Sequence, residues 1–243
     1  MDEDSFRRTL DRMRPWAQTR LRSLLTALAS AAESPKGYIE EILQKFDEAH
    51  TLVICEYEYD VIERVLGAGF VAVQAQITRV ASGALAIRRL ASAINVELDE
   101  LPKNRREYVD ASCPSHPACK CIQVIDDAAN YFKHHTQWGA DWAQVTNLNE
   151  PTIDRVSGYG AEPTASDNIQ RMLRHLGYRN LWQLVLLAHD VDDWAIGWVN
   201  TCEDAVHKIW CQDECRCKTA RRSATPPWIA DDTDDQSGSH EST

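Results

Sequence analysis

An apolar repeat in the middle of the chain constrains the fold most strongly. Apolar side chains recur there at alternating spacings of three and four residues: Phe70, Val73, Ile77, Val80, Ala84, Ile87, Ala91 and Ile94. Such a near-heptad seam is typical of a long helix packed along another helix. A similar period runs through residues 39–65, and Gly67 and Gly69 separate the two stretches. We therefore expect a long antiparallel hairpin over residues 37–96 that reverses at these glycines, with one uninterrupted helix as the less favoured alternative.

Helical spacing also dominates the rest of the chain. A first helix is expected to end near residue 32, because Ser34-Pro35 follows. Further helices are expected over residues 122–142 and, in several pieces, over residues 167–215. Polar stretches between these helices are interpreted as irregular connectors. Prolines and glycines are few and strand-type alternation is scarce, so the predicted fold class is all-α, a helical bundle.

The predicted organisation is a single helical domain over residues 1–218, followed by a disordered acidic tail over residues 219–243. The net charge is −11, and removing the five acids of residues 223–243, where no Lys or Arg occurs, leaves −6 for the rest. This mild acidity argues against a strongly basic DNA-binding protein. The N-terminus has no signal-type apolar core, and the most apolar run, residues 184–188, is too short to cross a bilayer. We expect a cytoplasmic protein with no membrane association.

Placing residues 122–142 on a helical wheel separates an apolar face from a polar ridge. The ridge contains Asp126, Asn130, Lys133, His134, Gln137 and Asp141. Asn130, Lys133 and His134 have spacings that let them converge on one phosphate or ribose, with His134 able to transfer protons near neutral pH. A solvated helix face is the alternative interpretation of the same ridge. His135 falls on the apolar side and is expected in the core, bonded to a neighbouring helix.

Residues 129–134, Ala-Asn-Tyr-Phe-Lys-His, resemble the Arg-Asn-x-x-x-His signature of the HEPN superfamily of four-helix nucleotide-binding and ribonuclease domains. The resemblance implies metal-independent RNA cleavage at a cleft between two protomers, in a bacterial phage-defence or toxin–antitoxin setting. It assigns His134 as the acid and base, with Asn130 and Lys133 as phosphate or ribose contacts.

Ala129 stands where the family has Arg, so both an endoribonuclease and a degenerate, non-catalytic relative are left open. Gln137 and Asp141 are candidate substrate contacts. Arg171 and Arg174, on a later helix, could supply the missing guanidinium. The expected partners are RNA or a nucleotide, together with a second copy of the chain or another protein. No cofactor is required by this hypothesis.

Eight cysteines in a reducing compartment are expected to be thiols or metal ligands. Cys119-x-Cys121 and Cys215-x-Cys217 could together hold one tetrahedral zinc ion, or they could remain free thiols. The second functional hypothesis is therefore a non-catalytic helical interaction subunit, with or without zinc. A helix-turn-helix DNA reader over residues 167–187 ranks last, because it lacks a basic recognition helix.

Overall fold

The computed structural model describes residues 3–17, 21–111, 121–138, 141–145, 150–163, 165–179 and 183–223. Side chains are described in these ranges except at residues 144, 150 and 212–223. The described part of the chain is helical and contains no β-strand, which confirms the all-α prediction.

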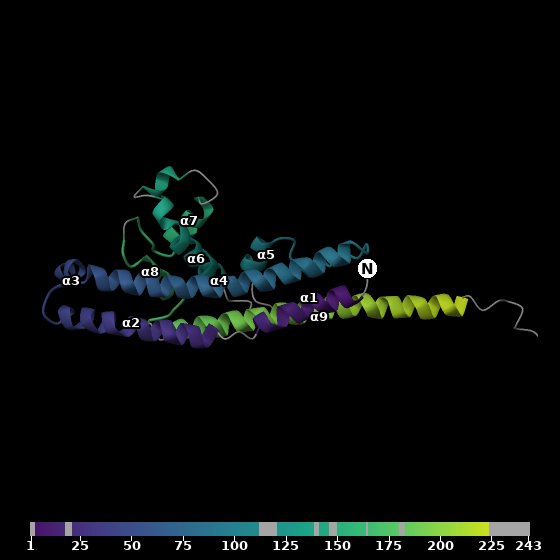
Figure 1. The fold of residues 1–243 in the computed structure, drawn as a ribbon. Helices are drawn as coiled ribbons and strands as arrows, with labels where there is room; N and C mark the ends of the chain where they lie inside the picture. The colour runs from purple at the N-terminus through teal and green to yellow at the C-terminus, as the bar shows by residue number, and fades with distance from the viewer. Residues whose placement is uncertain are drawn as a thin grey trace, which may run out of the picture.

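The first half of the chain forms a long hairpin (Figure 1). Helices α1 (Glu3–Ala17) and α2 (Leu21–Leu43) follow one another along one side of the molecule. The chain reverses at residues 44–47, where Asp47 caps the short helix α3 (Glu48–Ile54) by accepting a hydrogen bond from the amide of His50. Helix α4 (Glu56–Ser92) then runs back antiparallel to α2 and α1.

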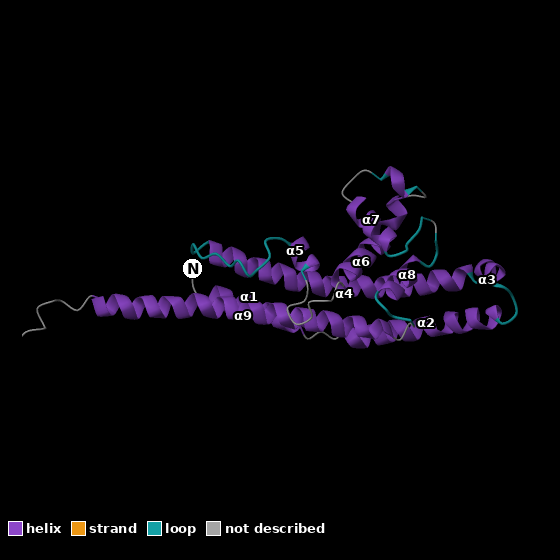
Figure 2. Cartoon of the chain, turned by 180° about the vertical axis from the view of Figure 1, so that it is seen from behind, coloured by secondary structure: helices purple, strands orange, loops and turns teal. Residues whose placement is uncertain are grey.

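Helix α9 (Leu184–Ser223) completes the long bundle by running parallel to α4 and packing against α1, α2 and α4. At 1.5 Å per residue, the 37 residues of α4 span about 55 Å and the 40 residues of α9 about 60 Å. Views from the front and from behind both show this elongated body (Figures 1 and 2).

A second layer of shorter helices covers the other side of α4. It consists of α5 (Arg105–Asp110), α6 (Cys121–Trp138), the 3₁₀ turn η1 (Trp142–Gln144), α7 (Glu150–Gly158) and α8 (Asn168–His175). Helices α5, α6 and α8 contact α4, and α7 packs on α6. The two stretches expected to be irregular therefore contain α5 and α7.

The seam from Phe70 to Ala91 forms part of the core, as predicted, whereas the period through residues 39–65 does so only in part, because Val53 and Tyr57 are exposed. Phe70, Val73, Ile77, Val80, Ala84, Ile87 and Ala91 on α4 are all fully buried. Helix α9 also has a buried apolar stripe, and Trp194 in it is the largest fully buried side chain of the described residues. The stripe comprises Val191, Trp194, Ala195, Trp198, Cys202, Ala205, Val206 and Ile209. Each helix turns one continuous face to its neighbours, which is why a simple period reveals it.

The predicted reversal at Gly67 and Gly69 is wrong, because α4 passes through both residues without interruption. Both glycines are buried at helix contacts instead. A Cβ on Gly67 would lie 2.0 Å from Cδ2 of Phe132 on α6, and one on Gly69 would lie 3.2 Å from Cδ2 of Leu184 on α9. Glycine serves here to let neighbouring helices approach closely, and helical packing on both sides offsets its poor helix propensity.

The other predicted boundaries also shift. The hairpin starts at α1 and reverses at residues 44–47, rather than spanning residues 37–96, because α2 continues through Pro35 to bury Ile39 and Ile42. Helix α6 ends at Trp138 instead of residue 142. Helix α9 extends to Ser223, five residues into the predicted acidic tail, and residues 224–243 of that tail lie outside the described residues.

By length and composition, α4 contains a stretch that could cross a membrane. Half of that stretch is buried within the protein. A helix at the centre of a helical bundle needs the same apolar composition.

Two polar side chains of α4, Gln74 and Gln76, are also buried. They bond to Asp126 on α6 and to Asp192 on α9, respectively, and so tie α4 to the helices on its two sides.

Candidate functional site

The polar ridge predicted on α6 turns partly toward α4 instead of facing solvent. Asp126 is 1% exposed, and its carboxylate accepts a 2.7 Å hydrogen bond from Nε2 of Gln74. Arg105, at the start of α5, forms an ion pair with the same carboxylate. Asp126 therefore joins three helices, and its buried charge is compensated by a guanidinium and an amide.

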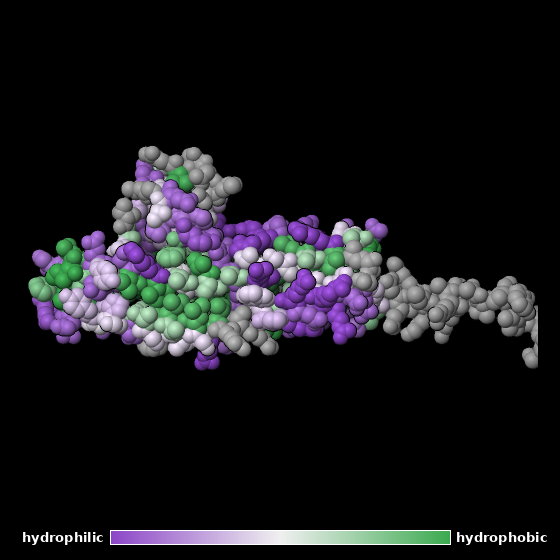
Figure 3. Space-filling view, in the orientation of Figure 1, coloured by the Kyte–Doolittle hydropathy of each residue, from purple (hydrophilic) through white to green (hydrophobic). Residues whose placement is uncertain are grey.

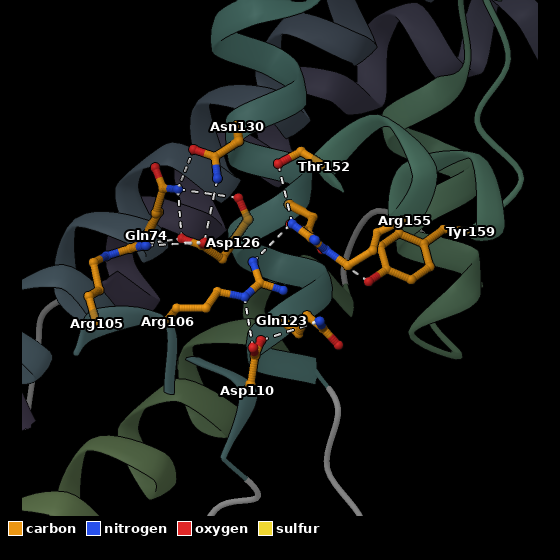
Figure 4. A network of polar contacts seen from close by, with 11 residues as sticks. Gln74, Arg105, Arg106, Asp110, Gln123, Asp126, Asn130, Thr152, Arg155 and Tyr159 are labelled. Atoms are coloured by element: carbon orange, nitrogen blue, oxygen red, sulfur yellow. Dashed lines mark hydrogen bonds and ion pairs between the residues drawn. The ribbon is translucent and has the colours of Figure 1, made fainter. Parts of the chain in front are cut away.

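Asn130 and Lys133, two of the three predicted catalytic residues, belong to the same network (Figure 4 shows Asn130 beside Gln74). Gln74 donates to Oδ1 of Asn130 at 2.9 Å, and Nζ of Lys133 donates to Oε1 of Gln74 at 2.7 Å. Partial burial lowers the pKa of Lys133. Both residues therefore have Gln74 as an internal partner, and their convergence on a phosphate or ribose stays a prediction.

His134, the predicted acid and base, is half-buried and forms no hydrogen bond or ion pair with any described residue. Gln137 lies one turn further along α6 and is exposed. Asp141 is not on the ridge, because α6 ends before it; its carboxylate caps the 3₁₀ turn by accepting from the amide of Ala143. Of the predicted ridge, only His134 and Gln137 remain without a polar partner in the described structure.

A second buried acid, Asp127, was not identified from the sequence. Asp127 is fully buried, and Arg155 on α7 binds it through two 2.7 Å hydrogen bonds, from Nε and from NH2. The hydroxyl of Tyr159 donates a third bond at 3.1 Å. Nη1 of Arg106 lies 3.9 Å from Oδ1 of the same carboxylate, and Figure 4 shows Arg106, Arg155 and Tyr159 close together. Burial raises the pKa of Asp127, while the bonds from Arg155 act in the opposite direction.

Arg171 and Arg174, the predicted suppliers of a guanidinium, are bound to Asp167 at the start of their own helix. Nε of Arg171 lies 2.7 Å from Oδ1, and NH2 of Arg174 lies 2.9 Å from Oδ2 of that carboxylate. Arg171 also contacts Glu162 and donates to the carbonyl of Gly160. In the described structure, no contact links this arginine pair to Asn130, Lys133 or His134.

The predicted zinc ligands cannot be compared as a set. Cys119 lies outside the described residues, as do the side chains of Cys215 and Cys217. Cys121 begins α6, is nearly buried and takes part in a disulfide bond. The disulfide differs from the expected thiol or metal ligand, because zinc is bound by a thiolate. A four-cysteine zinc site requires this bond to be reduced, and it stays a prediction.

A cavity lies elsewhere, between α4, α6, η1 and the start of α8. It encloses about 700 Å³ and opens to solvent. The lining combines aromatic rings, hydroxyls and charged groups: Asp60, Glu63, Arg64, Tyr131, Phe132, His135, Thr136, Trp142, Ala165, Ser166 and Ile169. Its size lies within the range of small-molecule sites.

His135 lines this cavity rather than filling the core. Its Nδ1 lies 3.2 Å from the carbonyl oxygen of Tyr131 and 3.0 Å from that of Phe132, so it bonds to its own helix and not to a neighbouring one. Its ring stacks on the ring of Tyr131 with centroids 5.0 Å apart. A carbonyl oxygen can only accept, so Nδ1 carries the proton in the neutral ring and Nε2 is left as an acceptor.

Glu63 on α4 reaches the start of α8, where its two carboxylate oxygens accept from the amides of Ile169 and Gln170 at 2.8 and 3.1 Å. It thereby caps α8, whose own N-cap residue, Asp167, makes no capping bond. Burial raises the pKa of Glu63 to about 7, and the nearby Asp167 carboxylate acts in the same direction. A carboxyl that titrates near neutrality inside a cavity is a common property of ligand and catalytic sites.

Sequence patterns could not identify this cavity. Glu63 occupies an ordinary helical position, and its contacts with Ile169 and Gln170 span more than one hundred residues of chain.

In the motif at residues 129–134, Ala129 is fully buried, so that position of α6 faces the core and not the ridge. Comparison of the chain with protein families, with curated proteins and with solved structures finds no match.

Proposed function

We propose that this chain is a non-catalytic helical interaction protein that binds a partner protein through one end of its long bundle. That end, the hairpin tip, comprises residues 38–57: the end of α2, the reversal, α3 and the start of α4. The observation that carries the proposal is the concentration of exposed large apolar side chains there: Tyr38, Leu43, Phe46, Leu52, Val53, Ile54 and Tyr57.

The large apolar side chains at the tip are unusually exposed. Val53 is 79% and Tyr57 75% exposed, and in α3 only Thr51 is buried. Figure 3 shows hydrophobic surface at the end of the molecule formed by α3. A contiguous exposed apolar patch is costly in water and usually marks an interaction surface. The other large apolar side chains that are exposed in the described structure, such as Leu24 and Leu186, lie along the body of the bundle.

The charges around the tip indicate what kind of partner fits it. Residues 36–60 contain seven acids and two lysines. Both lysines pair with glutamates of α2, at 3.5 and 2.6 Å, whereas Glu48, Glu56 and Glu58 have no polar side-chain partner among the described residues. An acidic rim repels anionic lipid and an identical tip of a second copy. It complements an amphipathic helix whose apolar face is bordered by Lys and Arg, and we infer that this is the partner's binding element.

The contacts on α6 support the non-catalytic part of the proposal. Gln74 binds both Lys133 and Asn130, so both side chains are tied to α4. These bonds connect the two layers of the molecule, which is a structural role. The hairpin then acts as a rigid arm that presents its apolar tip.

The test uses two designed amphipathic peptides of ~18 residues, about five helical turns. Both carry the same leucine face, which is bordered by lysine in one and by glutamate in the other. Fluorescence anisotropy with the full chain is expected to show micromolar binding of the basic peptide and no saturable binding of the acidic one. A chain carrying Val53→Ser and Tyr57→Ser is expected to bind the basic peptide roughly tenfold more weakly.

Leu186→Ser is the matched control, because Leu186 is an exposed apolar side chain on α9, away from the tip. It is expected to leave peptide affinity unchanged. Equal binding of both peptides, or full binding by the double variant with an unchanged melting temperature, would refute the proposal. Sedimentation analysis completes the test: a dimer that Val53→Ser dissociates would make the partner a second copy of the chain instead.

A ribonuclease acting through His134 is the second candidate. The observation that favours it is the half-buried imidazole, which has no polar partner in the described structure and lies beside Lys133 on the same helix. Its test is the cleavage of single-stranded RNA by the purified chain with and without His134→Ala. Loss of cleavage in that variant, with His189→Ala as an exposed control on α9, would favour the ribonuclease. No cleavage by the unmodified chain would remove this candidate.

A further inference from the structure

The cavity between α4, α6, η1 and α8 is separate from the hairpin tip and from the α6 ridge, and its chemistry is unused by either function. Its walls come from helices that pack on one another in the fold, so the cavity is part of the folded structure. Tyr131 and Trp142 are 6% and 8% exposed, and their rings pack edge to face with centroids 6.1 Å apart. Phe132 and His135 continue this aromatic wall along α6.

Two polar groups of the cavity, His135 and Glu63, are held as acceptors by their own bonds, beside the hydroxyls of Thr136 and Ser166, which can donate or accept. Nε2 of His135 is an acceptor because Nδ1 donates to the carbonyls of its own helix. The Glu63 carboxylate accepts two amide bonds, one on each oxygen, and each oxygen keeps a lone pair for another donor. A ligand that donates hydrogen bonds therefore meets two fixed acceptors in this site.

The charges lead to the same conclusion. At the mouth, Asp60 and Arg64 form an ion pair at 2.6 Å and neutralise each other. Within the described lining, this leaves the Glu63 carboxylate without a cationic side chain beside it, and Asp167 lies nearby as a second acid. A phosphate or carboxylate ligand would be repelled here. A cation would be attracted by the carboxylate and by the faces of the aromatic rings.

We propose that this cavity binds a small organic cation: a protonated amine carried on a flat apolar group. The ammonium donates to Glu63 and to Nε2 of His135, and the apolar group packs among Tyr131, Phe132 and Trp142. This site is independent of the docking function proposed for the tip, so either can fail without the other.

The probe is benzylamine, compared with benzyl alcohol and benzoate, which keep the ring but are neutral and anionic. Isothermal titration calorimetry of the full chain at pH 8 is expected to give benzylamine a dissociation constant of about 1 mM or tighter, as suits a ligand of this size. Benzyl alcohol is expected to bind at least roughly tenfold more weakly, and benzoate not at all. Benzoate binding as tightly as benzylamine, or no binding of benzylamine, overturns the proposal.

Glu63→Gln removes the charge with little change of shape; the glutamine oxygen can still accept from one of the two amides at the start of α8, whereas its NH2 group cannot accept from the other. It is expected to weaken benzylamine at least roughly tenfold and to leave the alcohol unchanged. Glu58→Gln, an exposed acid on the same helix, is the control and is expected to have no effect. Equal benzylamine affinity in the two variants refutes the role of Glu63. Binding of benzyl alcohol by the Glu63→Gln chain shows that this variant is folded.

The pH dependence gives a second readout. Benzylamine stays protonated between pH 6 and 8, whereas burial places the pKa of Glu63 at about 7, so affinity is expected to rise across this interval. The groups that face Glu63 are Asp60 and Arg64 on α4, His135 on α6 and Asp167 at α8. Only the part of the pH profile that Glu63→Gln removes is assigned to Glu63.

Discussion

Replacing Gly67 by alanine tests the close contact between α4 and α6. In an exposed helix interior, Gly→Ala stabilises by about 1 kcal/mol, because alanine has the higher helix propensity. At Gly67, however, the new Cβ would lie 2.0 Å from Cδ2 and 2.4 Å from two further atoms of the Phe132 ring. Relieving this overlap requires the ring or the helix to move by more than 1 Å, and such overpacking costs about 1–3 kcal/mol, occasionally more.

The matched control is Gly37, which occupies an exposed position of α2, where an added Cβ would have no neighbouring atom within 4 Å. We expect Gly37→Ala to raise the free energy of unfolding by about 1 kcal/mol. At Gly67 the overpacking cost of about 1–3 kcal/mol acts against the same propensity gain, so Gly67→Ala is expected to lower the free energy of unfolding by up to about 2 kcal/mol and to leave the two variants about 1–3 kcal/mol apart. Urea denaturation followed by circular dichroism measures both.

A third variant separates steric overlap from a backbone requirement for glycine. If Phe132 is the cause, Gly67→Ala in a Phe132→Ala background should no longer destabilise, and the two substitutions should be strongly non-additive. If residues 67–69 formed a turn, the loss would persist in that background. Stabilisation by Gly67→Ala in the otherwise unchanged chain would refute the packing of α6 on α4 described above.

Three further predictions concern stability. Burial raises the pKa of Glu63 from 4.5 to about 7, so ionisation of this carboxyl is less favourable in the folded state. The free energy of unfolding should therefore fall as pH rises through this interval, by up to about 3 kcal/mol. Denaturation at several pH values should give a flatter profile for Glu63→Gln. Arg155→Met leaves the fully buried Asp127 carboxylate without its bidentate partner and should lower the free energy of unfolding by about 3–5 kcal/mol at neutral pH. Arg64→Met, at an exposed ion pair, should lower it by less than about 1 kcal/mol in the same urea titration. Pro35→Ala should stabilise the chain by about 1–3 kcal/mol, because Pro35 lies inside α2; an unchanged melting temperature would instead place a helix end there.

The helices with one buried face were predictable from the sequence, and the contacts between helices were not. Val73 and Ile77 repeat with the period of a helix because α4 turns one face to α2 and α9, and that regularity survives in the sequence. From the sequence alone, Gly67 is compatible with a helix break or with a close approach between two helices. The choice depends on whether a residue such as Phe132, 65 positions away, packs against it.

The same limit applies to the candidate site. A helical wheel placed Asn130 and Lys133 on one ridge, but it could not show that Gln74 binds both. It also placed His135 among the apolar residues, since the wheel describes one helix and the cavity is formed by several. Asp127 was missed because its partner Arg155 lies on α7, in a stretch that carries too weak a period to be identified as a helix.

The position of α9 has a consequence for how the chain is made. This last helix packs on α1, α2 and α4, so the apolar faces of the first half stay uncovered until the final third of the chain has been synthesised. A ribosome-bound chain that ends before α9 exposes residues of α1 and α4 that are buried in the finished protein, in addition to the tip. We expect such nascent chains to be bound by chaperones and to aggregate when released, while release after α9 yields a closed bundle.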